Sequence, residues 1–407
     1  MATMTGTTPH RLRRSLNTPL LTLYGLGVTV GAGIYVLVGT TVSVAGAYAP
    51  ISFLVAALVV AFTAFSYAEL STRFPVSAGE AAYVEHGFQS GTLATVVGLA
   101  VALSGMVSAS AVAIGAASYL QDLIPASETV LIIGIVALMG AVAMWGITQS
   151  VTVAASITIV ELGGLFLVVI WGFGVADPLG TDLREMVPPF TGPHWASIGA
   201  ASLLAFFAFV GFEDMVNVAE EVKDPVSVLP KSIVLTLIIA SLLYLATTAA
   251  VLMVVPMDAL ASSAAPLTLV FAGAPSSIQQ SFSLVAIVAT VNGVLIQMIM
   301  ASRVLYGLAD RGHLPSVLAM VSARTQTPVI ATLTVIMVII LLSLTLPIQA
   351  LAERTSQIVL FVFVLVNLAL VLLKLRGDAG SNCFHVPMAV PILGILTSLI
   401  LFGTAWL

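Results

Sequence analysis

Long apolar runs, separated by short polar or Pro- and Gly-rich connections, dominate the hydrophobic pattern of this chain. A run of about 20 apolar residues is long enough to cross a bilayer core of about 30 Å as a helix. Such runs lie at residues 18–42, 47–70, 92–121, 129–147, 152–175, 196–221, 231–255, 278–304, 327–345, 352–374 and 386–406. The pattern therefore predicts an all-α integral membrane protein with about 11 transmembrane helices.

The composition agrees with a membrane protein and argues against a soluble one. Of the 407 residues, 59% are hydrophobic and only 8% are charged, whereas a soluble domain carries about 25% charged residues. The net charge of −5 comes mainly from loops and segment ends, and the single cysteine, Cys383, has no partner for a disulfide. The lipid bilayer is therefore an expected partner, and nucleic acid is not.

The distribution of lysine and arginine predicts how the helices are oriented. Basic residues gather on the cytoplasmic side of membrane proteins. With residues 1–17 as a cytoplasmic tail, only Arg184 and Arg354 of the 13 basic residues fall outside. The first run is too long for a signal peptide and has no clear small-residue cleavage site. We expect a multi-pass protein of the cell (cytoplasmic) membrane with its N-terminus in the cytoplasm.

Two runs contain glycines that weaken a helical pattern. The first run includes YGLGVTVGAGIYVLVG and the sixth includes FAFVGFEDM. Each glycine weakens a helix by about 1 kcal/mol relative to alanine, so both runs are expected to unwind near the middle. Because these runs are five spans apart, they belong to two oppositely oriented halves, residues 18–175 and 196–374. Interrupted helices at matching places in such halves indicate a midplane binding site of a secondary transporter.

The glycines of the first run have two interpretations. Glycine in membrane helices also permits close packing of neighbouring helices, and this is the interpretation for Gly25 and Gly39. The clustered Gly31 and Gly33 are expected to be functional. Residues 386–407 follow the two halves as an additional transmembrane helix.

Four stretches, taken in order, are similar to one transporter family. They are GVTVGAGIYVLVG, YAELSTRFPVSAGEAAYVEHGFQ, FFAFVGFEDMVNVAEEVKDPVSVLPKSI and ASRVLYGLADRGHLPSVLAMVSARTQTP. They resemble the first span, the second-span exit, the sixth span and the eighth-span exit of the amino acid–polyamine–organocation (APC) family. The resemblance implies a leucine-transporter-type fold, a 5+5 inverted repeat with broken first and sixth spans. That family usually has twelve spans, and this chain stops after about eleven.

The break in the first span is expected to bind a carboxylate. Free N–H groups near Ala32 and Gly33 form a partial positive helix end, and the resemblance places Gly31, Ala32 and Gly33 on the carboxylate-binding segment of the family. Thr29 falls on a pocket-lining position. Its hydroxyl either contacts the substrate or bonds to a carbonyl of its own helix.

The break in the sixth span is expected to bind an ammonium group. The carbonyls near Phe207, Ala208 and Val210 are acceptors, and the resemblance places these residues on the amine-binding segment. An α-amino acid is the simplest ligand for the two breaks together. Phe207 falls where relatives place an aromatic gate, whereas two of the three phenylalanines Phe206, Phe207 and Phe209 are expected only to pack.

Three acids lie within spans without a deep lysine or arginine to pair with them, namely Glu161, Glu213 and Asp214. An ionisable residue inside the membrane is a functional candidate by default. Glu161 falls where several relatives have a lysine, and its alternatives are proton coupling, sodium binding and a structural protonated acid. Glu213 is the other coupling candidate, and Asp214 is expected to pack or cap.

Weaker polar signals surround these acids. Glu69, Arg73 and Glu80 lie around the second-span exit and indicate either an ion-pair gate or a solvated helix end. Three amides are expected to form interhelical hydrogen bonds; they are Asn292, Gln297 and Asn367. No metal-ligand or catalytic motif is recognised, so neither a metal nor an enzyme activity is expected.

The predicted function is secondary active transport of an amino acid by alternating access, with proton-coupled symport as the leading mode. The expected coupling ion is a proton, with sodium as an alternative, and no other cofactor is expected. The alternatives are an amino acid exchanger, a carrier of cationic amines or polyamines, and a non-transporting sensor. The sequence does not predict an oligomeric state.

Overall fold

The computed structural model describes most of the chain. The described residues are 14, 16–30, 33–76, 79–121, 123–145, 147–174, 183–190, 192–263, 265–322, 325, 327–377 and 383–404, and they include the side chains of all but 147–153, 220 and 221. These residues form helices joined by short connections, with a single isolated bridge between Leu16 and Val222. The prediction of an all-helical protein is therefore confirmed.

The α-helices differ widely in length. They are α1 (Thr18–Val30), α2 (Gly33–Ala45), α3 (Ala49–Arg73), α4 (Gly79–Phe88), α5 (Gly91–Gln121), α6 (Glu128–Trp145), α7 (Ile147–Gly174), α8 (Gly192–Phe207), α9 (Pro225–Val254), α10 (Met257–Ser262), α11 (Ser276–Asp310), α12 (Val329–Thr345), α13 (Ile348–Leu375) and α14 (Ala389–Thr404). Five 3-10 helices connect them: η1 (Gly46–Tyr48), η2 (Leu183–Met186), η3 (Phe212–Glu221), η4 (Pro266–Phe271) and η5 (Ser316–Ala319).

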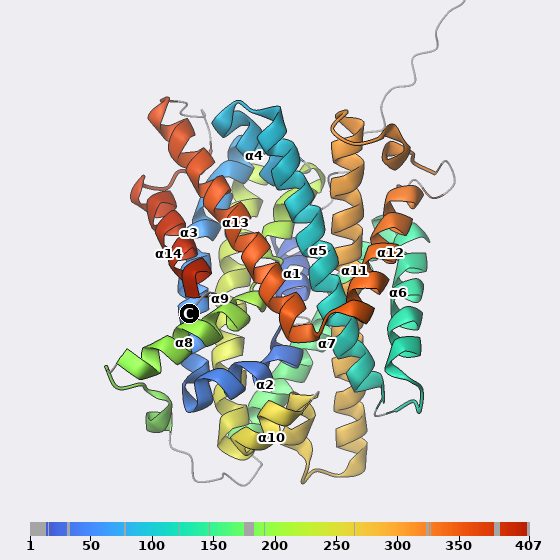
Figure 1. Cartoon of the computed structure of the whole chain (residues 1–407), viewed down its shortest axis with the longest axis vertical. Coiled ribbons are helices and arrows are strands. Elements are labelled where there is room, and N and C mark those ends of the chain that lie inside the picture. Colours follow the sequence, from blue (N-terminus) through green and yellow to red (C-terminus); the bar gives the residue numbers. More distant parts are fainter. Residues whose placement is uncertain are drawn as a thin grey trace, which may run out of the picture.

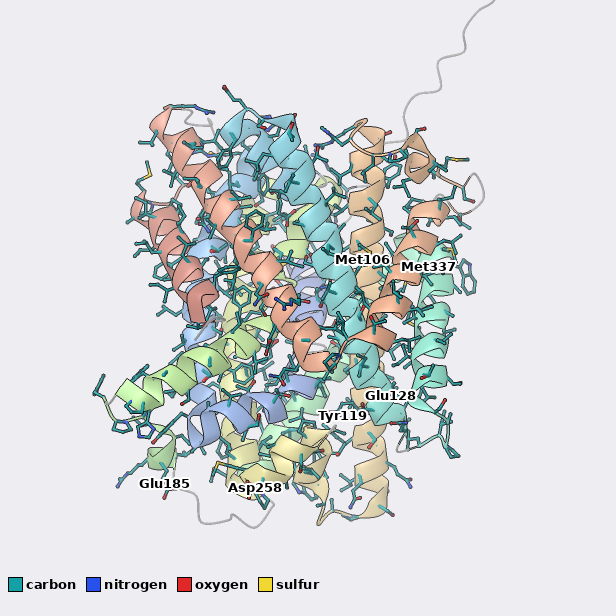
Figure 2. The ribbon with its side chains drawn as sticks, viewed as in Figure 1. Met106, Tyr119, Glu128, Glu185, Asp258 and Met337 are labelled. Atoms are coloured by element: carbon teal, nitrogen blue, oxygen red, sulfur yellow. The ribbon has the colours of Figure 1, made fainter. Side chains whose placement is uncertain are left out.

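Among the described residues, eight stretches are long and apolar enough to cross a membrane, and α12 and α14 are shorter apolar helices. The first of these stretches runs from Thr18 to Arg73 and includes α1, α2 and α3. Exposed acids such as Glu128, Glu185 and Asp258 lie at one end of the bundle, away from Met337 on its apolar flank (Figure 2). This distribution is that of a multi-pass membrane protein.

The sixth run is interrupted, as the glycine pattern predicts, whereas the predicted break of the first run, at residues 31 and 32, lies outside the described residues. α1 ends at Val30 and α2 begins at Gly33, while α8 ends at Phe207 and gives way to turn residues and then to η3. Gly211 lies in this second break with φ of +122°, a conformation that side chains rarely adopt. A Cβ atom there would also lie 2.3 Å from Val28 Cγ1. Glycine is therefore required where the sixth run unwinds.

The interrupted helices occupy the centre of the bundle. α1 packs against α7, α9 and η3, while α2 packs against α8. α2 and α8 lie slanted across the direction followed by the long helices α6 and α11 (Figure 1). Gly25 and Gly39 have the close contacts expected of packing glycines, because a Cβ would lie 2.4 Å from Met215 Sδ and from the Leu260 carbonyl oxygen, respectively. The long helices thus enclose two breaks at the middle of the molecule.

Candidate functional site

The two breaks touch each other. A Cβ atom on Gly33, the first residue of α2, would lie 2.1 Å from Ala208 Cα in the turn after α8. Only glycine permits this approach. Gly31 and Ala32, also predicted to bind substrate, lie outside the described residues. The structure therefore brings Gly33 and Ala208 into direct contact.

Tyr244 joins the two breaks through its side chain. Its Oη lies 2.6 Å from the Thr29 carbonyl oxygen and 2.7 Å from the Ala208 carbonyl oxygen, so its single hydrogen serves both acceptors. Sequence reasoning missed this residue of α9, and its only signal is a lone tyrosine in the aliphatic stretch LIIASLLYLATTAAVL. The tyrosine satisfies carbonyls that the helix breaks would otherwise leave unpaired in an apolar interior.

The other predicted acceptors are also engaged or buried. The Phe207 carbonyl accepts the N–H of Val210 at 3.1 Å, and Val210 is itself buried. Thr29 is buried too, and its Oγ1 has no hydrogen-bond partner among the described residues. A bond from this hydroxyl to its own helix is therefore not present. The carbonyls of Phe207 and Ala208 are satisfied within the protein rather than free.

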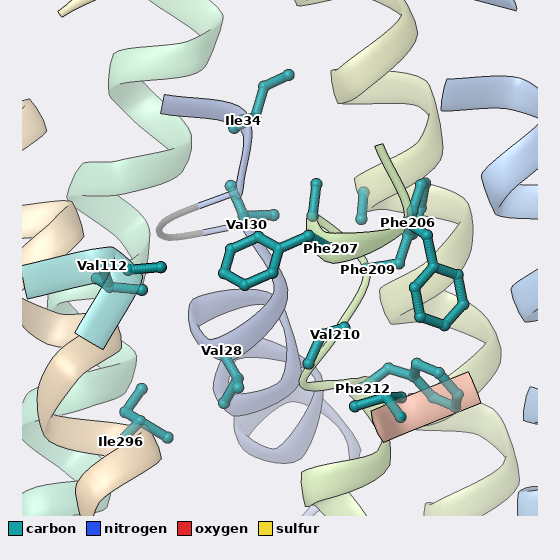
Figure 3. Close-up of a cluster of buried hydrophobic side chains, with 14 of the residues drawn as sticks. Val28, Val30, Ile34, Val112, Phe206, Phe207, Phe209, Val210, Phe212 and Ile296 are labelled. Atoms are coloured by element: carbon teal, nitrogen blue, oxygen red, sulfur yellow. The ribbon is translucent and has the colours of Figure 1, made fainter. Parts of the chain in front are cut away.

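The side chain of Phe207 differs in its surroundings from those of its neighbours. Phe206 packs against Phe363 with ring centroids 5.7 Å apart, and Phe209 packs against Tyr244 at 5.0 Å. Phe207 instead points toward Val30 and α5 (Figure 3). It lines a narrow hollow that has no room for a water molecule, and the other lining residues are apolar: Val36, Leu37, Ala111, Val112 and Ile348.

Glu161 is completely buried at the junction of α1, α7 and α11. Its Oε1 accepts a 2.9 Å hydrogen bond from Asn292 Nδ2, and among the described residues both Glu161 Oε2 and Asn292 Oδ1 lack a partner. The Tyr35 hydroxyl donates to the Glu161 backbone carbonyl at 2.7 Å. On α1, a Cβ at Gly27 would lie 3.5 Å from Asn292 Nδ2. The carboxyl group therefore faces an amide across the helix interface.

Glu213 and Asp214 have different surroundings although they are adjacent. Glu213 Oε2 accepts the N–H of Gly211 at 2.9 Å, so this carboxyl caps the start of η3. Asp214 Oδ2 accepts a 3.2 Å hydrogen bond from Gln297 of α11. Glu213 thus lies directly at the helix break, and Asp214 links η3 to a neighbouring helix.

Glu80 of α4 lies in the same region and is 1% exposed. Burial is the main reason why the pKa of this carboxyl is raised to about 8, and the nearby Glu213 contributes in the same direction. The sequence left open whether Glu80 lies at a solvated helix end. That alternative is wrong for Glu80, because α4 packs into the bundle and covers the side chain.

Glu69, near the end of α3, is also fully buried and forms an ion-pair cluster. It pairs with Arg73 one turn later and with Lys374 of α13 at 2.7 Å. It also accepts the N–H of Val386 at 2.8 Å, in the segment that leads to α14. The alternative of a solvated helix end is therefore wrong here as well, and the ion-pair alternative holds for Glu69 and Arg73.

The three interhelical amides are confirmed. Asn292 bonds to Glu161, Gln297 to Asp214, and Asn367 Nδ2 donates to Thr63 Oγ1 at 2.9 Å. Each bond connects two elements that are distant in the sequence. Interhelical hydrogen bonds of this kind hold membrane helices together where no hydrophobic driving force distinguishes protein from lipid.

An apolar helical bundle in which an interrupted sixth run contacts the first run at the centre is typical of secondary membrane transporters. The family model described as amino acid permease matches residues 16–407. The chain therefore belongs to the amino acid permease family of the APC superfamily, and it is a transporter rather than an enzyme. Family membership implies a leucine-transporter-like fold.

Curated relatives agree with this assignment. The chain is 29% identical to the branched-chain amino acid permease BcaP of Bacillus subtilis, over 96% of this chain and 88% of that protein. It is 28% identical to the methylthioribose transporter of the same organism, over 95% and 87%. It is also 29% identical to the vacuolar cationic amino acid transporter 2 of Arabidopsis thaliana, over 90% of this chain but only 60% of that longer protein.

Proposed function

We propose that this protein carries an α-amino acid across the cytoplasmic membrane by alternating access. The contact between the two helix breaks, Gly33 against Ala208 with Tyr244 bonded to both sides, is the observation that carries the proposal. In this proposal residues 18–175 and 196–374 are two inverted five-helix repeats. Residues 386–407 would contribute an eleventh transmembrane helix, and the N-terminal tail, residues 1–17, would lie in the cytoplasm.

The backbone ends of the substrate would bind at the two breaks. The start of α2 at Gly33, together with Gly31 and Ala32, would hold the carboxylate, because a helix N-terminus favours an anion. The Ala208 carbonyl would accept the ammonium group. That carbonyl now contacts the Tyr244 hydroxyl, so we infer that the ammonium replaces this hydroxyl when substrate binds. Thr29 and Val210 complete the lining.

The hollow beside Phe207 would receive the substrate side chain. Its lining residues are all apolar, so an aliphatic side chain fits it better than a charged one. The name of the branched-chain amino acid permease supports this choice, whereas the name of the cationic plant relative supports the alternative of a cationic substrate. Phe207 would move as a gate to admit the side chain, because the hollow has no room for it in this conformation.

Proton coupling at Glu161 is supported by the two atoms without partners. If Glu161 carried a proton on Oε2, it would donate to Asn292 Oδ1, while Asn292 Nδ2 already donates to Oε1. Both carboxyl oxygens of Glu161, and both Oδ1 and Nδ2 of Asn292, would then have a hydrogen-bond partner. Loss of the proton would leave a buried carboxylate, which is unfavourable. Sodium binding and a purely structural acid remain the alternatives, and Glu213, at the helix break, is the second coupling candidate.

Uptake into liposomes tests the function. We expect purified protein to accumulate radiolabelled leucine when an inward proton gradient is applied, with little accumulation of arginine or putrescine. Uptake that ignores the proton gradient but requires internal amino acid would favour exchange. Uptake driven by an inward sodium gradient would favour sodium coupling, and uptake of arginine or putrescine over leucine would favour the cationic carrier.

A further inference from the structure

A second group of buried polar atoms lies apart from the proposed substrate site, between α3, α4 and η3. Three of its atoms have no hydrogen-bond partner among the described residues: Tyr67 Oη, Tyr83 Oη and Glu80 Oε1. All three residues are at most 1% exposed. The rings of Tyr67 and Tyr83 meet edge to face at 6.2 Å. Buried polar groups are rarely left unpaired, so this cluster has a capacity for hydrogen bonding that the closed protein does not use.

The cluster lies where α4 closes against η3. The backbone N–H of Gly79, the first residue of α4, donates to Asn217 Oδ1 of η3 at 3.2 Å. A Cβ at Gly79 would lie 2.8 Å from Val216 Cγ2, so the two elements are in close contact. Glu80 follows directly on α4 and is covered by this contact. Any separation of α4 from η3 would therefore expose the Glu80 carboxyl to water.

The charged groups around Glu80 are acids. From η3 it faces Glu213 and Asp214, while Tyr67 of α3 and Tyr83 of α4 supply neutral hydroxyls. Burial is the main reason why the pKa of Glu80 is raised, to about 8, and the charge of Glu213 adds to this effect.

Three basic groups on or beside α3 and α13 have other partners. Arg73 of α3 and Lys374 of α13 pair with Glu69, and Arg376 Nη1 donates to the His86 carbonyl oxygen at 3.2 Å. On α5, which also packs against α4, Tyr119 donates to the distant Tyr35 carbonyl. Closure of α4 over Glu80 is therefore unfavourable while the carboxyl is ionised.

We propose that Glu80 is a further proton-binding residue of this transporter, which takes up a proton when α4 closes against η3 and releases it when they separate. This inference rests on the proposed function for its place in a transport cycle. The proton on Glu80 would bond within the Tyr67, Tyr83 and Asn217 cluster. Its release would leave a carboxylate beside Glu213, and their repulsion would favour the open contact.

The sign of the pH effect follows from this scheme. A carboxyl whose pKa is raised in the closed form disfavours closure once the pH exceeds its ordinary range near 4.5, and the effect levels off near pH 8. A single proton changes the closing equilibrium by at most about tenfold per pH unit. Protection of α4 from opening should therefore decrease as the pH rises from about 5 to about 8.

Hydrogen exchange on the full-length protein tests this proposal without any substrate. We expect the peptide covering residues 79–88, corrected for the chemical exchange rate, to lose protection as the pH rises. Glu80→Gln should abolish this dependence, because the amide does not ionise. Glu85→Gln, a half-buried position on the same helix, should retain it. Wild-type protein without the dependence, or Glu80→Gln protein that keeps it, would overturn the proposal.

A second variant covers the case in which Glu80→Gln does not fold. Glu213→Gln removes a charge that adds to the effect of burial on the pKa of Glu80, so the midpoint of the exchange transition should move to lower pH. An unchanged midpoint would overturn the proposal. Because exchange is measured without transport, a protein that shows the transition but carries no amino acid would contradict the proposed function alone.

Discussion

Tyr244 shows how one side chain can decide the state of a helix break. Unwound backbone inside a membrane requires partners for its carbonyls, and Tyr244 Oη serves the carbonyls of Thr29 and Ala208 at once. The same hydroxyl occupies the acceptor that an ammonium group would use. In the proposed binding mode, an ammonium group at the Ala208 carbonyl would therefore compete with the Tyr244 hydrogen bond that stabilises the break.

Removal of the Tyr244 hydroxyl should destabilise the protein without substrate. Tyr244→Phe leaves two buried carbonyls short of a donor, at a cost of about 1–3 kcal/mol, and this should lower the denaturation temperature of the purified protein. Tyr48→Phe is the matched control, because Tyr48 is half-buried and its ring packs against His194 away from the breaks. An equal effect in both variants would contradict the bridging role of Tyr244.

Glu161 should tolerate a neutral amide better than a charge. In Glu161→Gln the new amide can donate to Asn292 Oδ1 and accept from Nδ2, as the protonated acid would. We expect normal thermal stability and leucine transport that no longer depends on the proton gradient. Glu128→Gln, at an exposed position, should change neither property. Retention of wild-type gradient dependence in Glu161→Gln would exclude Glu161 as the coupling residue.

At the scale of the elements, the glycines at the breaks allow neighbouring segments to come into close contact. Gly33 begins α2 against Ala208, and Gly211 adopts its positive φ against Val28. Both contacts are too close for a Cβ atom. The glycines therefore set the distance between the two half-helices that would share the substrate.

A methyl group at Gly33 should push the breaks apart. Gly33→Ala places its Cβ 2.1 Å from Ala208 Cα, and overpacking of this kind costs about 1–3 kcal/mol. We expect lower thermal stability and loss of leucine uptake. Gly134→Ala in α6 has no atom within 4 Å of its Cβ and should be neutral or stabilising by up to about 1 kcal/mol. Normal uptake by Gly33→Ala would show that the breaks need not touch.

At the scale of the whole molecule, the Glu69 cluster ties three distant segments together. Glu69 of α3 bonds to Lys374 of α13 and to the backbone of Val386 before α14. α14 itself packs against α3 and α13. One buried carboxylate therefore links the segment before α14 to α3 and α13.

The contribution of the Glu69–Lys374 ion pair to stability can be measured with a double-mutant cycle. Lys374→Met leaves the Glu69 carboxylate with only Arg73 as a side-chain cation of full charge, and loss of a partner from a buried ion pair costs up to about 3–5 kcal/mol. We expect Lys374→Met to lower the unfolding temperature strongly in the wild-type background and weakly in the Glu69→Gln background. Equal effects in both backgrounds would show that the two residues are not coupled.

The sequence predicted the helical class and the break of the sixth run, because hydrophobic runs and clustered glycines indicate them directly. It also predicted the amides Asn292, Gln297 and Asn367 as interhelical partners, since unpaired amides are unfavourable within spans. Tyr244 was not predicted, because a tyrosine in an aliphatic run gives no sign of what its hydroxyl meets. The burial of Glu69 and Glu80 depends on how α4, α13 and the segment before α14 fold over them, and local sequence does not encode that contact.

The central claim is that the two breaks bind the two backbone ends of one amino acid. Competition against radiolabelled leucine uptake tests it most directly, using leucine, leucine methyl ester and 4-methylpentanoic acid. The ester lacks the carboxylate and the acid lacks the ammonium group, while all three keep the aliphatic side chain. We predict that leucine competes and that each of the two analogues competes at least about tenfold less well, which corresponds to about 1.4 kcal/mol of binding free energy. Equal competition by either analogue would contradict the claim.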